Sequence, residues 1–139
     1  MSTPITLNFT IYGEPCSKAN SRRLVTSSKT GKSLFIKSSK ALSYVKMFQQ
    51  QCPQIEPVIT DDVSVTIKIF YASRRPDLDE SVILDCMQSV TKKCPYQGRV
   101  VVRNNIYAND RQVKEKHIYW ALDRLNPRAE ITVQAIHCE

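Results

Sequence analysis

The sequence is poor in glycine and has no low-complexity tract, so its 139 residues give no sign of a disordered tail. No apolar run approaches the roughly 18 residues that a membrane-spanning helix needs. The first residues lack the basic flank and the long apolar stretch of a signal peptide. We therefore expect a cytoplasmic protein with no membrane partner, folded as one domain over residues 1–139.

Motifs for several common cofactors and sites are also missing. The five cysteines form no CxxC pair and neither histidine stands at a zinc-ligand spacing, which indicates reduced thiols. The stretch TGKS, residues 30–33, lacks the glycine that a phosphate-binding loop needs at the position of Thr26. No acidic-x-lysine pair follows Pro76-Asp77, as a PD-(D/E)xK nuclease requires. The sequence thus predicts no nucleotide cofactor.

Positive charge, by contrast, is in excess. Twenty lysines and arginines stand against thirteen acidic residues, giving a formal net charge of +7. Such an excess favours a polyanionic partner such as nucleic acid, although ribosome-associated and membrane-surface proteins share it. Between Gly13 and Lys40 the basic residues are accompanied by serine, threonine and asparagine, whose side chains can donate to phosphate oxygens. This segment is therefore a candidate for contact with the nucleic-acid backbone.

Hydrophobic periodicity predicts an α+β domain with a mixed β-sheet and two main helices. The expected strands are 5–12, 63–71, 100–102, 112–122 and 131–136, with a loose basic hairpin turning at 29–32. The expected helices are 38–51, spaced by Leu42, Val45 and Met47 or Phe48, and 80–90, spaced by Val82, Ile83, Met87 and Val90. Lys92 and Lys93 would close the second helix at the negative end of its dipole.

The stretch SRRPDLDESVILD, residues 73–85, places two aspartates at the end of a predicted strand. Asp79 suits the N-cap of the following helix and Glu80 suits its first turn, which is a purely structural interpretation. In extended backbone, however, Asp77 and Asp79 point to the same side about 6.5 to 7 Å apart, while Leu78 turns into the core. The pattern therefore also predicts a pair of carboxylates that converge on one cation.

Hard carboxylate oxygens suit Mg²⁺, for which Mn²⁺ can substitute. Asp110, in the turn-like stretch YANDRQV, is the expected third acidic ligand, with Glu80 and Asp85 as further acidic candidates. Such a centre in a basic protein fits phosphodiester hydrolysis, in which the metal activates a water and basic side chains hold the phosphates. The candidate DNA-binding residues are Lys18, Arg22, Arg23, Arg74, Arg75, Lys92, Lys93 and Lys114. Tyr96 and Tyr107 are candidates for stacking on exposed bases.

The order of a strand, RRPDLD, an amphipathic helix and a later NDRQV resembles the RusA family of Holliday junction resolvases. FTIYGEPCSKANSRR is similar to the opening strand and basic segment of that family, and FIKSSKALSY is similar to its entry into the first helix. The resemblance implies a homodimeric α+β endonuclease, encoded by a phage or prophage, that uses Mg²⁺ to make paired nicks across four-way DNA junctions. It assigns Asp77, Asp79 and Asp110 as the metal-binding catalytic aspartates.

The sequence also departs from the family pattern. Glu80, Ile83 and Met87 stand where the family has asparagine, lysine and aspartate, and Asp85 would match the last of these only after a two-residue deletion, which turns a helix face by about 200°. The candidates to replace the lysine are Lys92, Lys93, Lys114 and Arg75. The longer link at 91–106 is expected to be an added DNA-contacting or dimer element. The rival interpretation is a non-catalytic or degenerate DNA-binding module in which the aspartates only cap a helix.

Overall fold

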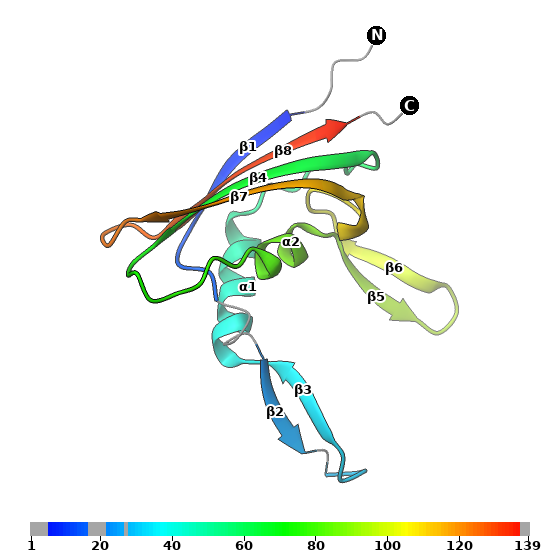
Figure 1. Cartoon of the computed structure of the whole chain (residues 1–139). Coiled ribbons are helices and arrows are strands. Elements are labelled where there is room, and N and C mark those ends of the chain that lie inside the picture. Colours follow the sequence, from blue (N-terminus) through cyan, green and yellow to red (C-terminus); the bar gives the residue numbers. More distant parts are fainter. Residues whose placement is uncertain (1–5, 17–21, 27, 137–139) are drawn as a thin grey trace.

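The computed structural model describes residues 6–16, 22–26 and 28–136, and shows a four-stranded sheet with two helices and two hairpins (Figure 1). The strands are β1 Thr6–Tyr12, β2 Arg22–Thr26, β3 Ser33–Lys37, β4 Asp62–Tyr71, β5 Val90–Cys94, β6 Gly98–Arg103, β7 Val113–Leu122 and β8 Arg128–Ile136. The helices are α1 Ser39–Gln51 and α2 Ser81–Met87, and a short 3₁₀ turn, η2, covers Asp110–Gln112. The α+β class with a mixed sheet and two helices is confirmed.

The sheet has the strand order β1-β8-β4-β7. β8 lies antiparallel between β1 and β4, whereas β4 and β7 run parallel, so the C-terminal ends of β4 and β7 meet at one edge. Val63, Val65, Ile67 and Ile69 of β4 are fully buried, as their alternation predicts. Branched side chains fit this pleated, covered surface well, which explains why the two central strands contain so many of them.

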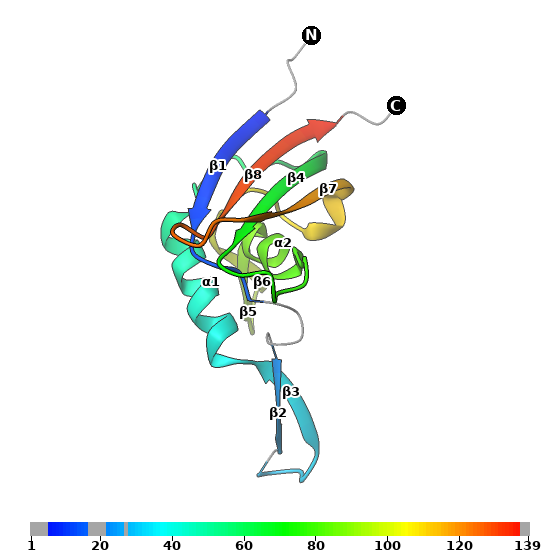
Figure 2. The ribbon, with the colours of Figure 1, turned by 60° about the vertical axis from the view of Figure 1, so that its left-hand side comes forward.

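Both helices pack on the same face of the sheet, as the two ribbon views show (Figures 1 and 2). α1 starts behind Ser38, whose hydroxyl accepts a hydrogen bond from the backbone N–H of Ala41 at 3.2 Å, as an N-cap does. The buried face of α1 is Ala41, Tyr44 and Phe48. The prediction for Leu42 was wrong, since that side chain is 55% exposed. The spacing from 41 to 48 brings the small Ala41 inward and turns Leu42 toward the solvent.

α2 is shorter than predicted. Val82, Ile83 and Met87 are buried as expected, but the helix ends at Met87, and Val90 is 39% exposed. The carbonyl of Met87 accepts hydrogen bonds from the N–H groups of Ile106 at 3.0 Å and Tyr107 at 3.3 Å. Because a returning segment takes this carbonyl, the chain leaves the helix there and continues into β5.

Lys92 and Lys93 consequently lie on β5 and do not close a helix, which corrects the prediction for them. β5 and β6 form one hairpin, which contains the predicted strand 100–102, and β2 and β3 form the predicted basic hairpin. Both hairpins extend away from the sheet on the side that carries the helices (Figure 1). The predicted basic hairpin and the hairpin that contains Lys92 and Lys93 are therefore the two elements that protrude from the sheet.

The stretch 104–110, expected to be an exposed turn, runs partly through the core. Tyr107 is fully buried, so the prediction that it could stack on exposed bases was wrong. Its hydroxyl donates to the carbonyl of Leu84 at 2.6 Å, and its backbone bridges to Ile59 and Gln88. Of the cysteines, Cys52 and Cys86 are buried, while Cys138 lies outside the described residues. In the part of the chain that the structure describes, neither helix has the length and apolar character to cross a membrane.

Candidate functional site

The loop that carries the two aspartates leaves the C-terminal end of β4 and is fixed by the last residue of that strand. Tyr71 is fully buried, and its hydroxyl donates to the carbonyl of Asp77 at 3.1 Å and accepts from the N–H of Asp79 at 3.2 Å. This hydroxyl occupies the core position beneath the segment. Leu78 is therefore turned outward and is 38% exposed, which corrects the prediction that it enters the core.

β7 supports the same loop from the side. The indole Nε1 of Trp120 donates to the carbonyl of Pro76 at 3.4 Å. At the end of the loop, directly before α2, a carboxylate oxygen of Glu80 lies 3.1 Å from the ammonium of Lys116. In the parallel pairing of β7 with β4, Trp120 lies opposite Ile69, near the end of β4, whereas Lys116 lies opposite Val65, closer to its start. Trp120 therefore meets the loop soon after it leaves β4, and Lys116 meets it where it enters α2. The segment from Pro76 to Glu80 is thus held at several points.

Glu14 approaches the loop from the segment that follows β1. Its carboxylate accepts a hydrogen bond from the N–H of Ala72 at 2.8 Å. Burial raises the pKa of the Tyr71 hydroxyl, the hydrogen bond from the backbone of Asp79 lowers it, and the charges of Asp79, Glu14 and Glu80 raise it further. Three carboxylates from two parts of the chain therefore surround one buried hydroxyl, which stays protonated at neutral pH.

Asp79 bonds to the first residue of α2 but is not its N-cap, so the predicted cap is wrong by one residue. One of its carboxylate oxygens accepts from the backbone N–H of Ser81 at 3.0 Å and from the Ser81 hydroxyl at 2.6 Å. The residue at the N-cap position itself is Glu80, whose side chain makes no capping bond. Asp77, in contrast, is exposed. The two aspartates thus differ, since one is tied to the start of α2 and the other is presented to solvent.

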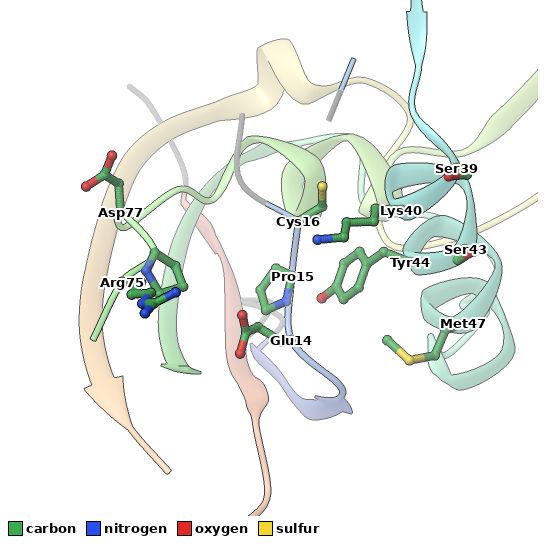
Figure 3. Close-up of a pocket in the computed structure, with 11 residues that line it drawn as sticks. Glu14, Pro15, Cys16, Ser39, Lys40, Ser43, Tyr44, Met47, Arg75 and Asp77 are labelled. Carbon is green, nitrogen blue, oxygen red and sulfur yellow. The ribbon is translucent and has the colours of Figure 1, made fainter. Parts of the chain in front are cut away.

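A pocket of about 930 Å³ opens beside this loop (Figure 3). It lies between the segment after β1, the first half of α1 and the loop after β4. Figure 3 shows Arg75 and Asp77 on one wall and Lys40 on the opposite wall, with Glu14 between them. Its lining residues are Glu14, Pro15, Cys16, Ser39, Lys40, Ser43, Tyr44, Met47, Arg75, Pro76 and Asp77. The cations on two walls suit a phosphate-containing ligand. The carboxylates of Glu14 and Asp77 would repel such a ligand unless a cation bound between them.

The thiol of Cys16 connects the pocket to the second aspartate. Burial raises the pKa of the Cys16 thiol, while a hydrogen bond with Ser38 and the charge of Lys40 lower it and the charge of Asp79 raises it. Lys40 and Asp79 therefore both lie within electrostatic reach of the same sulfur. The pocket and the aspartate loop form one continuous region of the surface.

Asp110 lies elsewhere, at the opposite end of α2. It is the first residue of η2, it is exposed, and its N–H donates to the side-chain oxygen of Gln88 at 3.0 Å. Burial and then the charges of Asp110 and Asp85 raise the pKa of the buried Tyr107 hydroxyl. Asp110 thus lies beyond Met87, the last residue of α2, whereas Asp77 and Asp79 lie before Ser81, its first residue. Among the residues it describes, no three histidine, cysteine or acidic side chains are close enough to hold a metal ion together.

The predicted DNA-binding residues are distributed over the two hairpins and the loop. Arg74 and Arg75 are exposed after β4, Lys114 is exposed at the start of β7, Lys92 and Lys93 are exposed on β5, and Arg22 and Arg23 lie on β2. Lys18 lies outside the described residues. Among the members of this set whose side chains the structure describes, Arg75 alone lines the pocket.

No family model and no curated protein matches the chain. The resemblance to the RusA family therefore depends on the sequence motifs alone. Ile83, at the position of the family lysine, is fully buried under the sheet.

Three charged residues of this region were not singled out from the sequence: Glu14, Lys40 and Lys116. Lys40 belongs to the basic segment, but only the start of α1 at Ser39 aims it at the pocket. Glu14 and Lys116 reach the loop through strand pairing, β1 through β8 and β7 directly on β4. No local pattern in the sequence marks Glu14 and Lys116.

Two buried tyrosines provide a test of how the loop is held. We expect Tyr71→Phe to lower the free energy of unfolding by about 1 to 2 kcal/mol, because the backbone carbonyl of Asp77 and the backbone N–H of Asp79 lose their hydrogen bonds to the Tyr71 hydroxyl. The matched variant is Tyr44→Phe. Within the described residues, the Tyr44 hydroxyl is the one buried side-chain oxygen or nitrogen with no hydrogen-bond partner. Its removal should leave stability unchanged or raise it by up to about 1 kcal/mol. Urea denaturation compares the two, and equal losses would contradict the role of the Tyr71 hydroxyl.

Proposed function

We propose that the protein is a metal-dependent, structure-selective endodeoxyribonuclease that resolves Holliday junctions or other branched DNA by paired nicks. The observation that carries the proposal is the aspartate loop at the end of β4. Tyr71 holds this loop in place, and it borders a pocket with Lys40 and Arg75 on opposite walls. The resemblance of the RRPDLD and NDRQV motifs to the RusA family supports the same activity.

Asp77 and Asp79 would hold the cation in this proposal. Mg²⁺ is commonly bound by one or two carboxylates, with waters and substrate phosphate oxygens completing the shell, so a pair of aspartates fits when DNA is present. Asp110, which the resemblance assigns as the third ligand, lies beyond the C-terminal end of α2, where its N–H donates to Gln88, so in this proposal the primary role falls to the pair. When bound, the metal would neutralise charge on the phosphate and lower the pKa of an attacking water.

The other residues of the region would bind and position the DNA strand. Lys40 and Arg75 face each other across the pocket and would hold phosphates on either side of the cleaved one. The contacts of Trp120 with Pro76 and of Lys116 with Glu80 would restrain the loop when a charged ligand binds. Preorganised positioning of this kind is worth more in catalysis than added flexible charge.

A homodimer is part of the proposal. One chain carries one aspartate loop and would make one nick, whereas resolution of a four-way junction needs two nicks in opposed strands. A twofold axis relating two chains matches the twofold symmetry of the junction and places the two sites accordingly.

The alternative is a DNA-binding module without catalytic activity. Two observations favour it: the Asp79 carboxylate already caps α2 through Ser81, and Glu80 is paired with Lys116. In addition, the position of the family lysine is occupied by Ile83, which is buried. A DNA-binding module of this kind would use the same basic surfaces and bind branched DNA without cutting it.

Cleavage of a labelled four-way junction, beside a linear duplex built from the same arms, separates these two functions. With Mg²⁺ or Mn²⁺ we expect symmetric nicks in the junction and an intact linear duplex. With a chelator in place of the metal we expect binding without nicks. Tight junction binding with no cleavage in either metal would contradict the nuclease and support the binding module.

A further inference from the structure

The β5–β6 hairpin is the clearest feature that the aspartate site does not use. From Cys86 to Asn109 the chain contains four basic residues and no acidic one. Three of the four cations belong to the exposed part of the hairpin: Lys92, Lys93 and Arg99. The ribbon extends away from the body on the side of the helices, apart from the β2–β3 hairpin (Figure 1). Its charge is therefore concentrated on a protruding two-stranded element.

The cations are present on both faces of this ribbon. Lys93 pairs with Arg99 across the two strands and so shares a face with it, whereas Lys92, opposite Val100, points to the other face. Arg99 also donates to the hydroxyl of Thr91 at 3.1 Å, which keeps its guanidinium against the ribbon. At the tip, Tyr96 is 96% exposed. A ligand with negative charge on two sides of a channel would meet a cation on each side.

The root of the ribbon is rigidly attached to both helices. Asn105 is fully buried, and its amide nitrogen donates to the side-chain oxygen of Gln49 at 2.9 Å and to the carbonyl of Cys86 at 3.2 Å. Its oxygen accepts from Arg103 at 2.9 Å, and the same guanidinium donates to the carbonyl of Gln49. An element that is ordered before binding loses less conformational entropy when it binds.

We propose that the β5–β6 hairpin binds in the major groove of duplex DNA. That groove is about 12 Å wide, admits a two-stranded β-ribbon, and has phosphates along both walls. Lys92 contacts one wall, while Lys93 and Arg99 contact the other. The major groove of A-form RNA is too narrow and deep for such an element, so the partner is DNA. The site goes beyond the proposed nuclease activity, because it binds a duplex arm with or without cleavage.

A second copy of this chain is a poorer occupant of the same ribbon. The valines of β6 form an exposed edge that could pair with another β6 across a twofold axis. Antiparallel pairing centred on Val101 would set Arg99 of each copy opposite Arg103 of the other. Like charges directly opposite each other destabilise a pair of strands, and this pairing would add two such contacts to the Lys93–Arg99 pair already in each hairpin. The phosphates of DNA would instead complement these charges.

The test compares two double variants that remove the same net charge. Lys92→Gln/Lys93→Gln changes the ribbon, and Lys68→Gln/Arg124→Gln changes exposed residues away from it. Fluorescence anisotropy gives the affinity of each for a linear duplex at several salt concentrations. For the ribbon variant we expect the slope of log K against log salt to become shallower by about 1.8, with about a 10- to 30-fold weaker affinity at 0.15 M salt. The control variant should retain the wild-type slope.

Equal slopes for the two variants would overturn the proposal, and so would an equal loss of affinity for double-stranded RNA of the same length. A changed molecular mass of the ribbon variant in light scattering, with unchanged DNA binding, would instead make the hairpin a contact between copies. The outcome is independent of the nuclease test. A protein that never nicks DNA can still show the slope difference, and an active nuclease can lack it.

Discussion

Asp79→Asn is expected to slow cleavage of a four-way junction by about a thousandfold while leaving the fold and junction binding intact. Asparagine keeps a side-chain oxygen that can accept from the N–H and hydroxyl of Ser81, so the start of α2 is preserved. It loses the negative charge that a metal ion requires. The substitution therefore separates the two roles of this residue. Single-turnover cleavage in saturating Mg²⁺, with junction affinity measured in chelator, gives both quantities.

Two further variants make the result decisive. Asp61→Asn removes an exposed carboxylate at the other end of β4 and should leave the cleavage rate unchanged. Asp79→Ala removes the capping oxygen as well as the charge, and should add a loss of about 1 kcal/mol in the free energy of unfolding. If Asp79→Asn cuts at the wild-type rate and only Asp79→Ala is impaired, the residue is a cap and the binding module is the better description.

The strands were predicted well because burial leaves a simple local signature. The alternation in residues 63–71 requires one covered face, and the structure buries that face of β4 completely. The end of α2 was not predictable in the same way. It depends on Ile106 and Tyr107, which take the carbonyl of Met87 from a distant part of the chain. Helical spacing alone continued the helix to Val90, where the chain is already a strand.

The candidate site was likewise predictable from the sequence only in part. The position of Asp77 and Asp79 at the end of a strand follows from the sequence, because the strand before them is unambiguous. Their neighbours Glu14 and Lys116 do not, because only the order of strands in the sheet brings them to the loop. Leu78 was assigned to the core from alternation, but the hydroxyl of Tyr71 fills that place and turns the leucine outward.

Asn105→Ala is expected to lower the free energy of unfolding by about 2 to 4 kcal/mol. The side chain is fully buried, and its amide nitrogen donates to Gln49, Cys86 and Gln88 at 2.9, 3.2 and 3.1 Å. Alanine would remove one partner from each of these acceptors and from the guanidinium of Arg103. The Cys86 carbonyl would keep its bond from the Gln49 amide, and the guanidinium would keep its bond to the Gln49 carbonyl. Urea denaturation monitored by far-ultraviolet circular dichroism measures the change.

The neighbouring Asn104→Ala is the matched control, because Asn104 is only partly buried, and we expect it to change stability by less than about 0.5 kcal/mol. Asn105→Asp sharpens the test further. It keeps the oxygen that accepts from Arg103 but replaces the donor to the carbonyls of Cys86 and Gln88 with a second acceptor, so we expect a loss at least as large as for alanine. Equal, small effects at both asparagines would mean that the root of the ribbon is not fixed by this network. A destabilised root with unchanged duplex affinity would separate the rigidity of the ribbon from its binding to DNA.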